Sequence, residues 1–580
     1  MKTRWFDKVT KTPLQEYPRP QLVRKDWQNL NGIFNYAITG HTDKIPSKFD
    51  GEILVPFAVE SDLSGVAKRV SKENLLWYEK KFTLDPCFEG KRVRLNFGAV
   101  DWQCRVYING TQIGEHTGGY DPFSFDITDY LVDGENTLNL RVFDPTDESS
   151  QPRGKQASKS HGFWYTATTG IWQTVWLEPV NEVYIEKLKL LPDIDAGTIN
   201  VKTVLNGEAD LHATVKKGDL IIFNGRISAD ENIPVDDAIL WSPENPFLYD
   251  LTVRVIDKNN AELDSVESYF GMRKFSIGKD KAGLPRIMLN NEPYFQRGLL
   301  DQGYWVDGGL TPPTDEAMIY DIQTMKDLGF NMLRKHIKVE PARWYYHCDR
   351  LGMIVWQDMV SGVQNLPMII VGGLPNITIT NISDSHYSWF GRSDKYFRDE
   401  FEDEMYRMID NLYNYPCIGC WVPFNEAWGQ FDAKRIGTEI KAYDPSRIVD
   451  HASGWHDQKG PDLKSVHRYV VPVTMPRLDG RPFVLSEFGG LSYKIEGHQY
   501  DERKSFGYNI NYTDPAKYTA AYKRMFEKQI IPLVKRGLCA TVYTQVSDVE
   551  FEVNGLLTYD REILKIDADV AREINSQLKY

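Results

Sequence analysis

Two stretches of this sequence, CWVPFNEAWG (420–429) and PFVLSEFGG (482–490), each place a glutamate directly after a run of apolar residues. Short apolar runs of this kind are typical of strands that are buried on both faces, as in parallel sheets. Burying a carboxylate is costly unless the group is paired or takes part in chemistry. Glu426 and Glu487 therefore indicate a functional site at the ends of two strands.

Similar apolar runs on either side of these stretches complete a set of eight predicted strands. They cover residues 294–301, 331–336, 353–358, 420–426, 448–453, 465–469, 483–488 and 539–545. Helical patterns, such as those at 315–328 and 398–412, separate several of the strands. Repeated strand and helix units of this number are typical of a TIM barrel, so we predict a (β/α)8 barrel over residues 278–580. The segment 359–395 is too long for a plain loop, and we expect it to form a lid or wall of the site.

The first 277 residues have a different pattern, in which short runs of alternating polar and apolar residues lie between turn residues. Such runs occupy 75–84, 91–100, 104–116, 137–144 and 172–180, and they continue in the same style from 184 onward. Alternation with a period of two is typical of antiparallel sandwiches. We predict one β-sandwich over residues 1–180 and a second, of immunoglobulin-like length, over 181–277.

Composition excludes several classes of protein. The chain has 68 Lys and Arg against 81 Asp and Glu, a net charge of −13, which disfavours nucleic acid as a partner. Six cysteines in 580 residues are too few for a disulfide scaffold, and the single Cys417-x-x-Cys420 pair is expected to be buried and structural. With no signal-like or membrane-spanning apolar run, we expect a cytoplasmic protein that does not bind membranes.

Polar side chains end most of the predicted barrel strands, which is where the active sites of TIM barrels lie. Two carboxyl groups in such a place suit glycoside hydrolysis. One can protonate the leaving oxygen, while the other, as a carboxylate, faces the positive charge that develops at the anomeric carbon. Aromatic residues that follow strand ends, above all Trp428 and Trp455, could stack against a sugar, although each is more often a core residue. The aromatic fraction of 13% allows both uses.

Several motifs resemble those of glycoside hydrolase family 2, the group that contains β-galactosidases, β-glucuronidases and β-mannosidases. They are GIWQTVWLEPV (170–180), WSPENPFLYDLTVRV (241–255), NNEPYFQRG (290–298), CDRLGMIVWQD (348–358) and NYPCIGCWVPFNEAWG (414–429). The resemblance covers essentially the whole chain. It implies a jelly-roll β-sandwich, an immunoglobulin-like β-sandwich and a catalytic TIM barrel.

The resemblance also implies a retaining mechanism, with Glu426 as general acid/base and Glu487 as nucleophile. Asn425 would contact the sugar 2-hydroxyl, Arg334 would keep the nucleophile ionised, and the pair His467 and Tyr469 would contact sugar and orient the nucleophile. For His467 a satisfied core histidine is about as common. The remaining candidates for substrate binding are His336, Asp358, Trp428, Trp455 and Tyr543.

Departures from the family pattern bear on the substrate. FEVNGLLTYDR (551–561) lacks the lysine that β-glucuronidases carry there for the uronate carboxylate, which disfavours a uronic acid substrate. We therefore expect an exo-acting enzyme on neutral β-linked sugars, with β-galactosides first and β-glucosides or β-mannosides next.

Two other functions are also compatible with the sequence. The chain could be a catalytically weak carbohydrate-binding or scaffold protein, or a transglycosylase acting through the same covalent intermediate. A homo-oligomer is plausible for the family. No cofactor is expected, and no cluster of residues has the spacing of a metal site.

Overall fold

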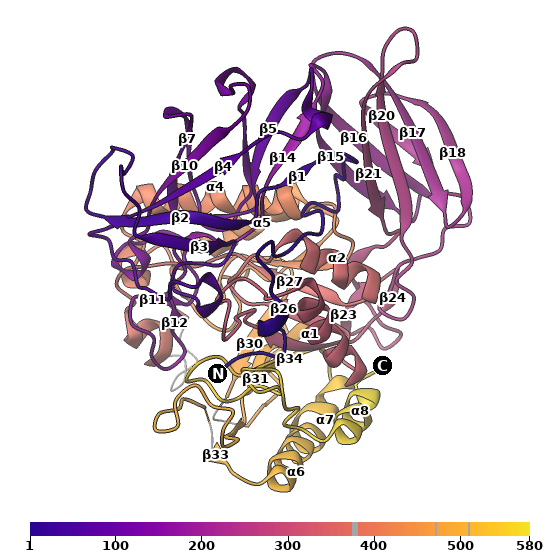
Figure 1. Cartoon of the computed structure of the whole chain (residues 1–580). Helices are drawn as coiled ribbons and strands as arrows, with labels where there is room; N and C mark the ends of the chain where they lie inside the picture. Colours follow the sequence, from indigo (N-terminus) through magenta and orange to yellow (C-terminus); the bar gives the residue numbers. More distant parts are fainter. Residues whose placement is uncertain (374–380, 470–471, 509–510) are drawn as a thin grey trace.

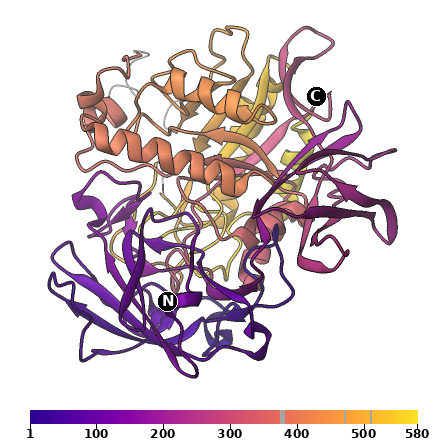
Figure 2. The same cartoon turned by 90° about the horizontal axis from the view of Figure 1, so that it is seen from above.

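The computed structural model describes residues 1–373, 381–469, 472–508 and 511–580 (Figure 1). Two β-sandwiches, in indigo and magenta, lie against one side of a barrel coloured orange and yellow. Figure 2 shows the same three parts from above. The predicted fold class of two sandwiches followed by a TIM barrel is confirmed. Within the described residues, no helix is long and apolar enough to span a membrane.

The first sandwich consists of two antiparallel sheets that enclose one apolar core. The four-stranded sheet has the order β1 (Gln28–Asn29), β14 (Val175–Val180), β5 (Arg92–Phe97), β9 (Phe123–Asp126). The six-stranded sheet has the order β3 (Gly51–Val55), β2 (Gly32–Thr39), β4 (Leu75–Phe82), β10 (Asn136–Phe143), β7 (Gln103–Ile108), β8 (Thr111–Thr117). A long segment between β10 and β14 contains the short strands β11 (Gln156–Ala157) and β12 (Tyr165–Thr166), which pair in parallel.

The second sandwich has a three-stranded and a four-stranded sheet. Their orders are β15 (Tyr184–Asp193), β16 (Thr198–Asn206), β19 (Asp230–Pro234) and β18 (Leu220–Ile227), β17 (Asp210–Lys217), β20 (Tyr249–Ile256), β21 (Glu262–Phe270). In β17 the buried Leu211, Ala213 and Val215 alternate with less buried residues, so one face of the strand packs into the core. Residues that span the predicted boundary at 277/278 form a small antiparallel sheet of β22 (Phe275–Lys279), β23 (Pro285–Leu289) and β24 (Glu292–Pro293).

The barrel is an eight-stranded parallel sheet. Along the sheet the strands are β29 (Ile448–Val449), β28 (Ile418–Val422), β27 (Ile354–Asp358), β26 (Met332–Lys335), β25 (Gln296–Asp301), β34 (Leu538–Thr544), β31 (Phe483–Gly489) and β30 (Lys464–Arg468). Strands β27, β28, β31 and β34 are buried along their whole length, because the barrel interior lies on one side and helices on the other. Cys417 and Cys420 are free and fully buried, as predicted.

Helices cover the outside of the barrel. They are α1 (Asp315–Asp327), α2 (Ala342–Leu351), α4 (Lys395–Leu412), α5 (Ala433–Tyr443), α6 (Pro515–Met525), α7 (Ile531–Val534) and α8 (Ala568–Gln577). Thr314 and Asp394 cap α1 and α4 by accepting a hydrogen bond from a first-turn amide. In the described part of the chain, no α-helix lies between β29 and β30 or between β30 and β31, which explains the close spacing of these strands in the sequence.

Two strands end well before the last residue that the sequence predicts for them. The strand predicted at 420–426 starts at Ile418 and ends at Val422, because Pro423 follows and the backbone then turns, with positive φ at Glu426 (50°) and Ala427 (61°). The strand predicted at 448–453 ends at Val449. The two irregular segments remain joined, since the Glu426 amide donates to the Ser453 carbonyl at 2.9 Å. Glu426 is therefore presented by a turn and not by a strand.

Candidate active site

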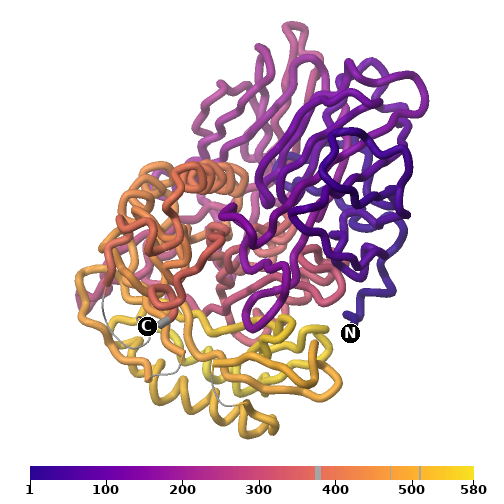
Figure 3. The backbone as a smooth tube through the Cα atoms, turned by 90° about the vertical axis from the view of Figure 1, so that its left-hand side faces the viewer, coloured from indigo at the N-terminus to yellow at the C-terminus, as the bar shows by residue number. Residues whose placement is uncertain are grey.

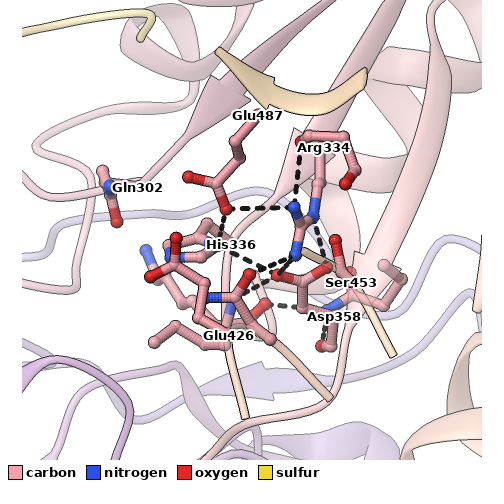
Figure 4. A network of polar contacts seen from close by, with 12 residues as sticks. Gln302, Arg334, His336, Asp358, Glu426, Ser453 and Glu487 are labelled. Carbon is pink, nitrogen blue, oxygen red and sulfur yellow. Dashed lines mark hydrogen bonds and ion pairs between the residues drawn. The ribbon is translucent and has the colours of Figure 1, made fainter. Parts of the chain in front are cut away.

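Arg334, at the end of β26, connects the site residues of several strands. Its Nε and Nη2 atoms bind the two carboxylate oxygens of Asp358 at 2.9 and 3.0 Å, and Nη1 donates to Glu487 Oε1 at 3.0 Å. Nη2 also donates to Asn425 Oδ1 at 2.8 Å (Figure 4). The Arg334 side chain is fully buried, and its acidic partners raise the pKa of its guanidinium above the ordinary value despite the burial, which acts in the opposite direction. One permanent cation thus positions three of the predicted residues.

The two predicted carboxylates lie side by side at the barrel mouth. An oxygen of Glu426 and an oxygen of Glu487 are within 4.8 Å of each other. Glu487 on β31 is 4% exposed, whereas 26% of the Glu426 side chain is exposed. Carboxyl groups separated by about 5 Å are typical of retaining glycosidases, while inverting enzymes leave a wider gap for a water molecule.

Tyr469 and His467 bridge this pair. The Tyr469 hydroxyl hydrogen-bonds Glu487 Oε2 and lies 3.2 Å from Glu426 Oε1. His467 Nδ1 lies 2.8 Å from the same Glu426 oxygen, and its Nε2 is 3.0 Å from Ser453 Oγ. Burial lowers the pKa of His467 to about 4, so the ring is neutral near pH 7. If Ser453 donates to Nε2, the proton is on Nδ1 and is donated to Glu426.

Burial has opposite consequences for the acids and for the imidazoles of the site. It raises the pKa of Glu426 above the ordinary glutamate value, although the positive charges of Lys155 and Arg334 act in the other direction. It lowers the pKa of His336 well below the ordinary value, so His336 is neutral as well. His336 Nδ1 lies 3.0 Å from Asp358 Oδ2 and 3.9 Å from Glu487 Oε1. The cluster therefore contains one carboxyl group that tends to hold its proton, next to a second one that is paired with Arg334.

The predicted aromatic residues are placed differently from one another. Trp428 packs edge-on against Trp164 of the first sandwich, with ring centroids 4.6 Å apart. Trp455 packs against His467 at 5.4 Å. The indole nitrogens of Trp428 and Trp455 are buried and have no hydrogen-bond partner among the described residues. Trp455 thus lies beside the carboxylate cluster through its contact with His467, whereas Trp428 packs between the first sandwich and the loops of the barrel.

Tyr543 does not reach this cluster. Its ring is fully buried and packs against Phe488, Tyr522 and Phe526, of which the last two belong to the helical layer around the barrel. Its hydroxyl accepts a hydrogen bond from the Leu491 amide at 3.3 Å. Tyr543 is therefore a core residue in this structure and not a sugar contact. The alternation of side chains along β34, which depends on register, turns it outward.

The predicted lid or wall at 359–395 falls partly outside the described residues, because 374–380 are not described. Of its first part, Val363 and Leu366 pack with Trp428. His456, on the segment after β29, hydrogen-bonds the Ile370 carbonyl at 2.9 Å and the Ile382 amide at 3.1 Å. The described flanks thus lie beside the site.

One part of the site was missed by the sequence interpretation. The segment after β10 of the first sandwich runs to the barrel, as Figure 3 shows in purple, and brings Lys155, Trp164 and Tyr165 to the mouth. There the Tyr165 hydroxyl hydrogen-bonds Glu552, and Lys155 Nζ lies 4.0 Å from the same carboxylate. The only hint in the sequence is a long stretch, 145–171, that contains Phe163-Trp164-Tyr165 and no predicted strand.

Glu426, His467 and Glu487 could in principle offer three ligand atoms to a metal ion. The guanidinium of Arg334 already occupies one oxygen of Glu487 and repels a second cation at this place. The geometry fits an acid and base pair better. A cavity of about 460 Å³ lies elsewhere, where the sandwiches meet the barrel, and none of the predicted site residues lines it.

Three comparisons relate this chain to known proteins. Among curated proteins, a β-galactosidase of Thermoanaerobacter pseudethanolicus is 27% identical over 384 residues, which are 63% of this chain and 46% of that protein. A putative β-glucuronidase of Formosa agariphila is 26% identical over 464 residues, 72% of this chain and 50% of that protein. The chain thus spans about half the length of these curated relatives.

Among solved structures, a β-galacturonidase of Eisenbergiella tayi has a TM-score of 0.71 at 18% identity, covering 97% of this chain and 99% of that chain. At this identity the likeness shows the fold alone. Three family models match in succession: "Glycosyl hydrolases family 2, sugar binding domain" over 29–178, "Glycosyl hydrolases family 2" over 183–273 and "Glycosyl hydrolases family 2, TIM barrel domain" over 308–479. Because these matches follow the order of the three folded parts, the chain belongs to glycoside hydrolase family 2.

Proposed function

We propose that this protein is an exo-acting retaining β-glycosidase that removes terminal, non-reducing, neutral sugars by double displacement, with β-galactosides as the first substrates to test. The observation that carries the proposal is the pair Glu426 and Glu487, whose oxygens lie within 4.8 Å of each other. This separation suits direct attack by one carboxylate and leaves no room for a water molecule between the second carboxylate and the sugar.

Each carboxyl group has surroundings that suit its role. Glu487 is paired with Arg334 and hydrogen-bonded to Tyr469, so it is ionised and oriented for attack on the anomeric carbon. Burial raises the pKa of Glu426, which favours the protonated form that donates to the leaving oxygen. After the covalent glycosyl-enzyme forms, Glu426 takes the proton of the incoming water, which then displaces Glu487.

The choice of a neutral sugar has two supports. A curated relative of this chain is named a β-galactosidase, and the stretch 551–561 has no lysine that could pair with a uronate carboxylate. Uronides are the competing class of substrate, because the similar proteins include a putative β-glucuronidase and a β-galacturonidase.

Two measurements test the proposal. The first compares kcat/KM on nitrophenyl β-D-galactoside, glucoside, mannoside, glucuronide and α-L-arabinopyranoside. The galactoside is expected to have the highest kcat/KM. Glu487→Gly is expected to lose turnover and to recover it in azide, with formation of an α-glycosyl azide. Unchanged activity of Glu487→Gly would contradict the proposed nucleophile, and a catalytically weak binding protein would show no turnover of any glycoside.

A further inference from the structure

The histidine next to the general acid/base candidate is closed off from the barrel mouth. The side chain of His467 has no exposed surface, whereas 26% of the Glu426 side chain is exposed. A Cβ atom on Gly454 would lie 2.9 Å from His467 Nδ1, so backbone covers the ring on that side, and Trp455 packs against it at 5.4 Å. His467 therefore has a fixed orientation and cannot touch a bound sugar. Its contact with the substrate machinery is Glu426 Oε1, 2.8 Å from Nδ1.

The neighbours of the other ring nitrogen decide where the proton of the neutral ring lies. Nη1 of Arg334 donates to His467 Nε2 at 3.4 Å, and the Ser453 hydroxyl lies 3.0 Å from the same atom. A guanidinium group has donors and no acceptor, so a proton on Nε2 would point at a cation. Glu487 Oε1, at 3.7 Å, is too far from Nε2 to accept a hydrogen bond from it. The ring therefore carries its proton on Nδ1 and donates it to Glu426 Oε1.

Ser453 fixes the geometry of this contact. Its carbonyl accepts a hydrogen bond from the Glu426 amide at 2.9 Å, while its hydroxyl faces the His467 ring. Its own amide donates to the Phe424 carbonyl at 2.9 Å. One buried residue thus holds both the backbone of the acid and the ring that bonds the side chain of the acid, so the two keep their relative position.

The two oxygens of Glu426 are unequal as a result. Oε1 receives the His467 N–H and lies 3.2 Å from the Tyr469 hydroxyl. Oε2 makes no hydrogen bond within the described part of the chain, and the Glu426 side chain is partly exposed. A proton on Oε1 would face the N–H of His467, so a protonated Glu426 carries its proton on the other oxygen. The acid proton is therefore on Oε2, which is free to face the leaving group.

We propose that His467 is a positioning residue for the general acid/base. It anchors Oε1 of Glu426 and leaves the transferable proton on Oε2. That proton passes to the leaving oxygen as the glycosidic bond breaks and Glu487 bonds to the anomeric carbon. In the second step Oε2 takes a proton from water, whose oxygen bonds to the anomeric carbon as the bond to Glu487 breaks, and His467 keeps its own proton throughout. This inference rests on the proposed glycosidase function and adds a residue that acts through Glu426.

Two substitutions of similar size test the N–H donor. His467→Leu removes it, and His467→Asn returns an amide donor near the place of Nδ1. Both are assayed by kcat/KM on aryl glycosides with leaving groups from phenol to dinitrophenol. His467→Leu is expected to lose at least about tenfold on the phenyl glycoside and no more than about twofold on the dinitrophenyl glycoside, whose departure needs no proton. His467→Asn is expected to stay within about threefold of the wild type on both.

His347→Leu is the matched control. His347 is also a buried histidine, and its Nε2 lies 2.9 Å from a carboxylate oxygen of Asp315, but it belongs to α2 on the outside of the barrel. This variant is expected to leave the dependence on the leaving group unchanged. The double variant Glu426→Gln/His467→Leu is expected to match Glu426→Gln within about twofold on every glycoside, because His467 acts only through the acid.

Three outcomes overturn the inference while leaving the proposed function intact. They are an equal loss for His467→Leu on all leaving groups, equal losses in the Leu and Asn variants, and additive losses in the double variant. A wild type without activity on any glycoside overturns both the inference and the proposed function.

If thermal unfolding shows that His467→Leu fails to fold, Ser453→Ala decides. This variant removes one of the two neighbours that keep the proton off His467 Nε2. It is expected to lower kcat/KM on the phenyl glycoside more than on the dinitrophenyl glycoside. An equal effect on the two glycosides overturns the inference.

Discussion

The Nη1 atom of Arg334 lies 3.0 Å from Oε1 of Glu487, and the side chains of both residues are almost completely buried. The same guanidinium binds both oxygens of Asp358. This single cation therefore compensates two carboxylates in a place where an unpaired charge would be costly. Its removal is expected to affect both catalysis and stability, and the two effects can be separated.

Arg334→Met should lower kcat by at least about a hundredfold, because Glu487 loses the group that keeps it ionised and oriented. It should also lower the free energy of unfolding by about 3–5 kcal/mol, since Asp358 keeps a buried charge without its partner. The double variant Arg334→Met/Asp358→Asn should recover part of the stability in urea unfolding and none of the activity. Recovery of activity in the double variant would show that Arg334 acts only through Asp358.

Glu426→Gln should lose general acid catalysis, which contributes about 10²- to 10⁴-fold. The loss of kcat/KM should be large for aryl glycosides with poor leaving groups and small for dinitrophenyl glycosides, whose departure needs no proton. The slope of log kcat/KM against leaving-group pKa measures this directly, because kcat/KM reports the step in which the leaving group departs. An equal loss for all leaving groups would contradict the assignment of Glu426 as the acid.

Lys155→Met should move the high-pH limb of kcat/KM to higher pH. The Lys155 charge lowers the pKa of Glu426, and burial raises it. Without the ammonium group the pKa of Glu426 rises further, so the protonated and active form persists to higher pH. Lys159 is exposed on the same segment, so Lys159→Met is the control and should leave the pH profile unchanged. A high-pH limb that stays in place or moves to lower pH in Lys155→Met would contradict an electrostatic link between Lys155 and Glu426.

Gly154→Ala should weaken the docking of the segment that carries Lys155. The added Cβ would lie 2.8 Å from the Ile337 carbonyl oxygen. The backbone at residue 154 must move to relieve this contact, and Lys155 moves with it. Gly90→Ala is a matched control, because Gly90 has φ +68° and open space around a Cβ. Both variants should lose about 1 kcal/mol of stability from backbone strain. Only Gly154→Ala should also lower kcat/KM by about tenfold or more, and an equal effect of the two variants on activity would contradict the docking role.

Much of the fold follows from local pattern. Alternating residues in stretches such as 210–219 predict an antiparallel strand, and the apolar run before Ser486 and Glu487 predicts a buried parallel one. In both cases the pattern works because the side-chain period of a strand, together with burial, determines which residues are apolar. The predicted strand at 420–426 is wrong at its end because Pro423 and the turn at Glu426 interrupt the ladder, and tertiary contact with Ser453 stabilises that turn.

By itself, the sequence determined that Glu426 and Glu487 follow apolar runs and are therefore hard to explain by packing alone. Only the tertiary structure decided that their oxygens lie within 4.8 Å of each other, that Tyr543 faces helices, and that Lys155 reaches the site from another folded part. The physical reason is that the apolar run before each glutamate shows locally that its carboxylate is buried, and burial of a charge is costly. Which side chain compensates that charge depends on how segments far apart in the sequence pack together, and a local sequence pattern does not contain this information.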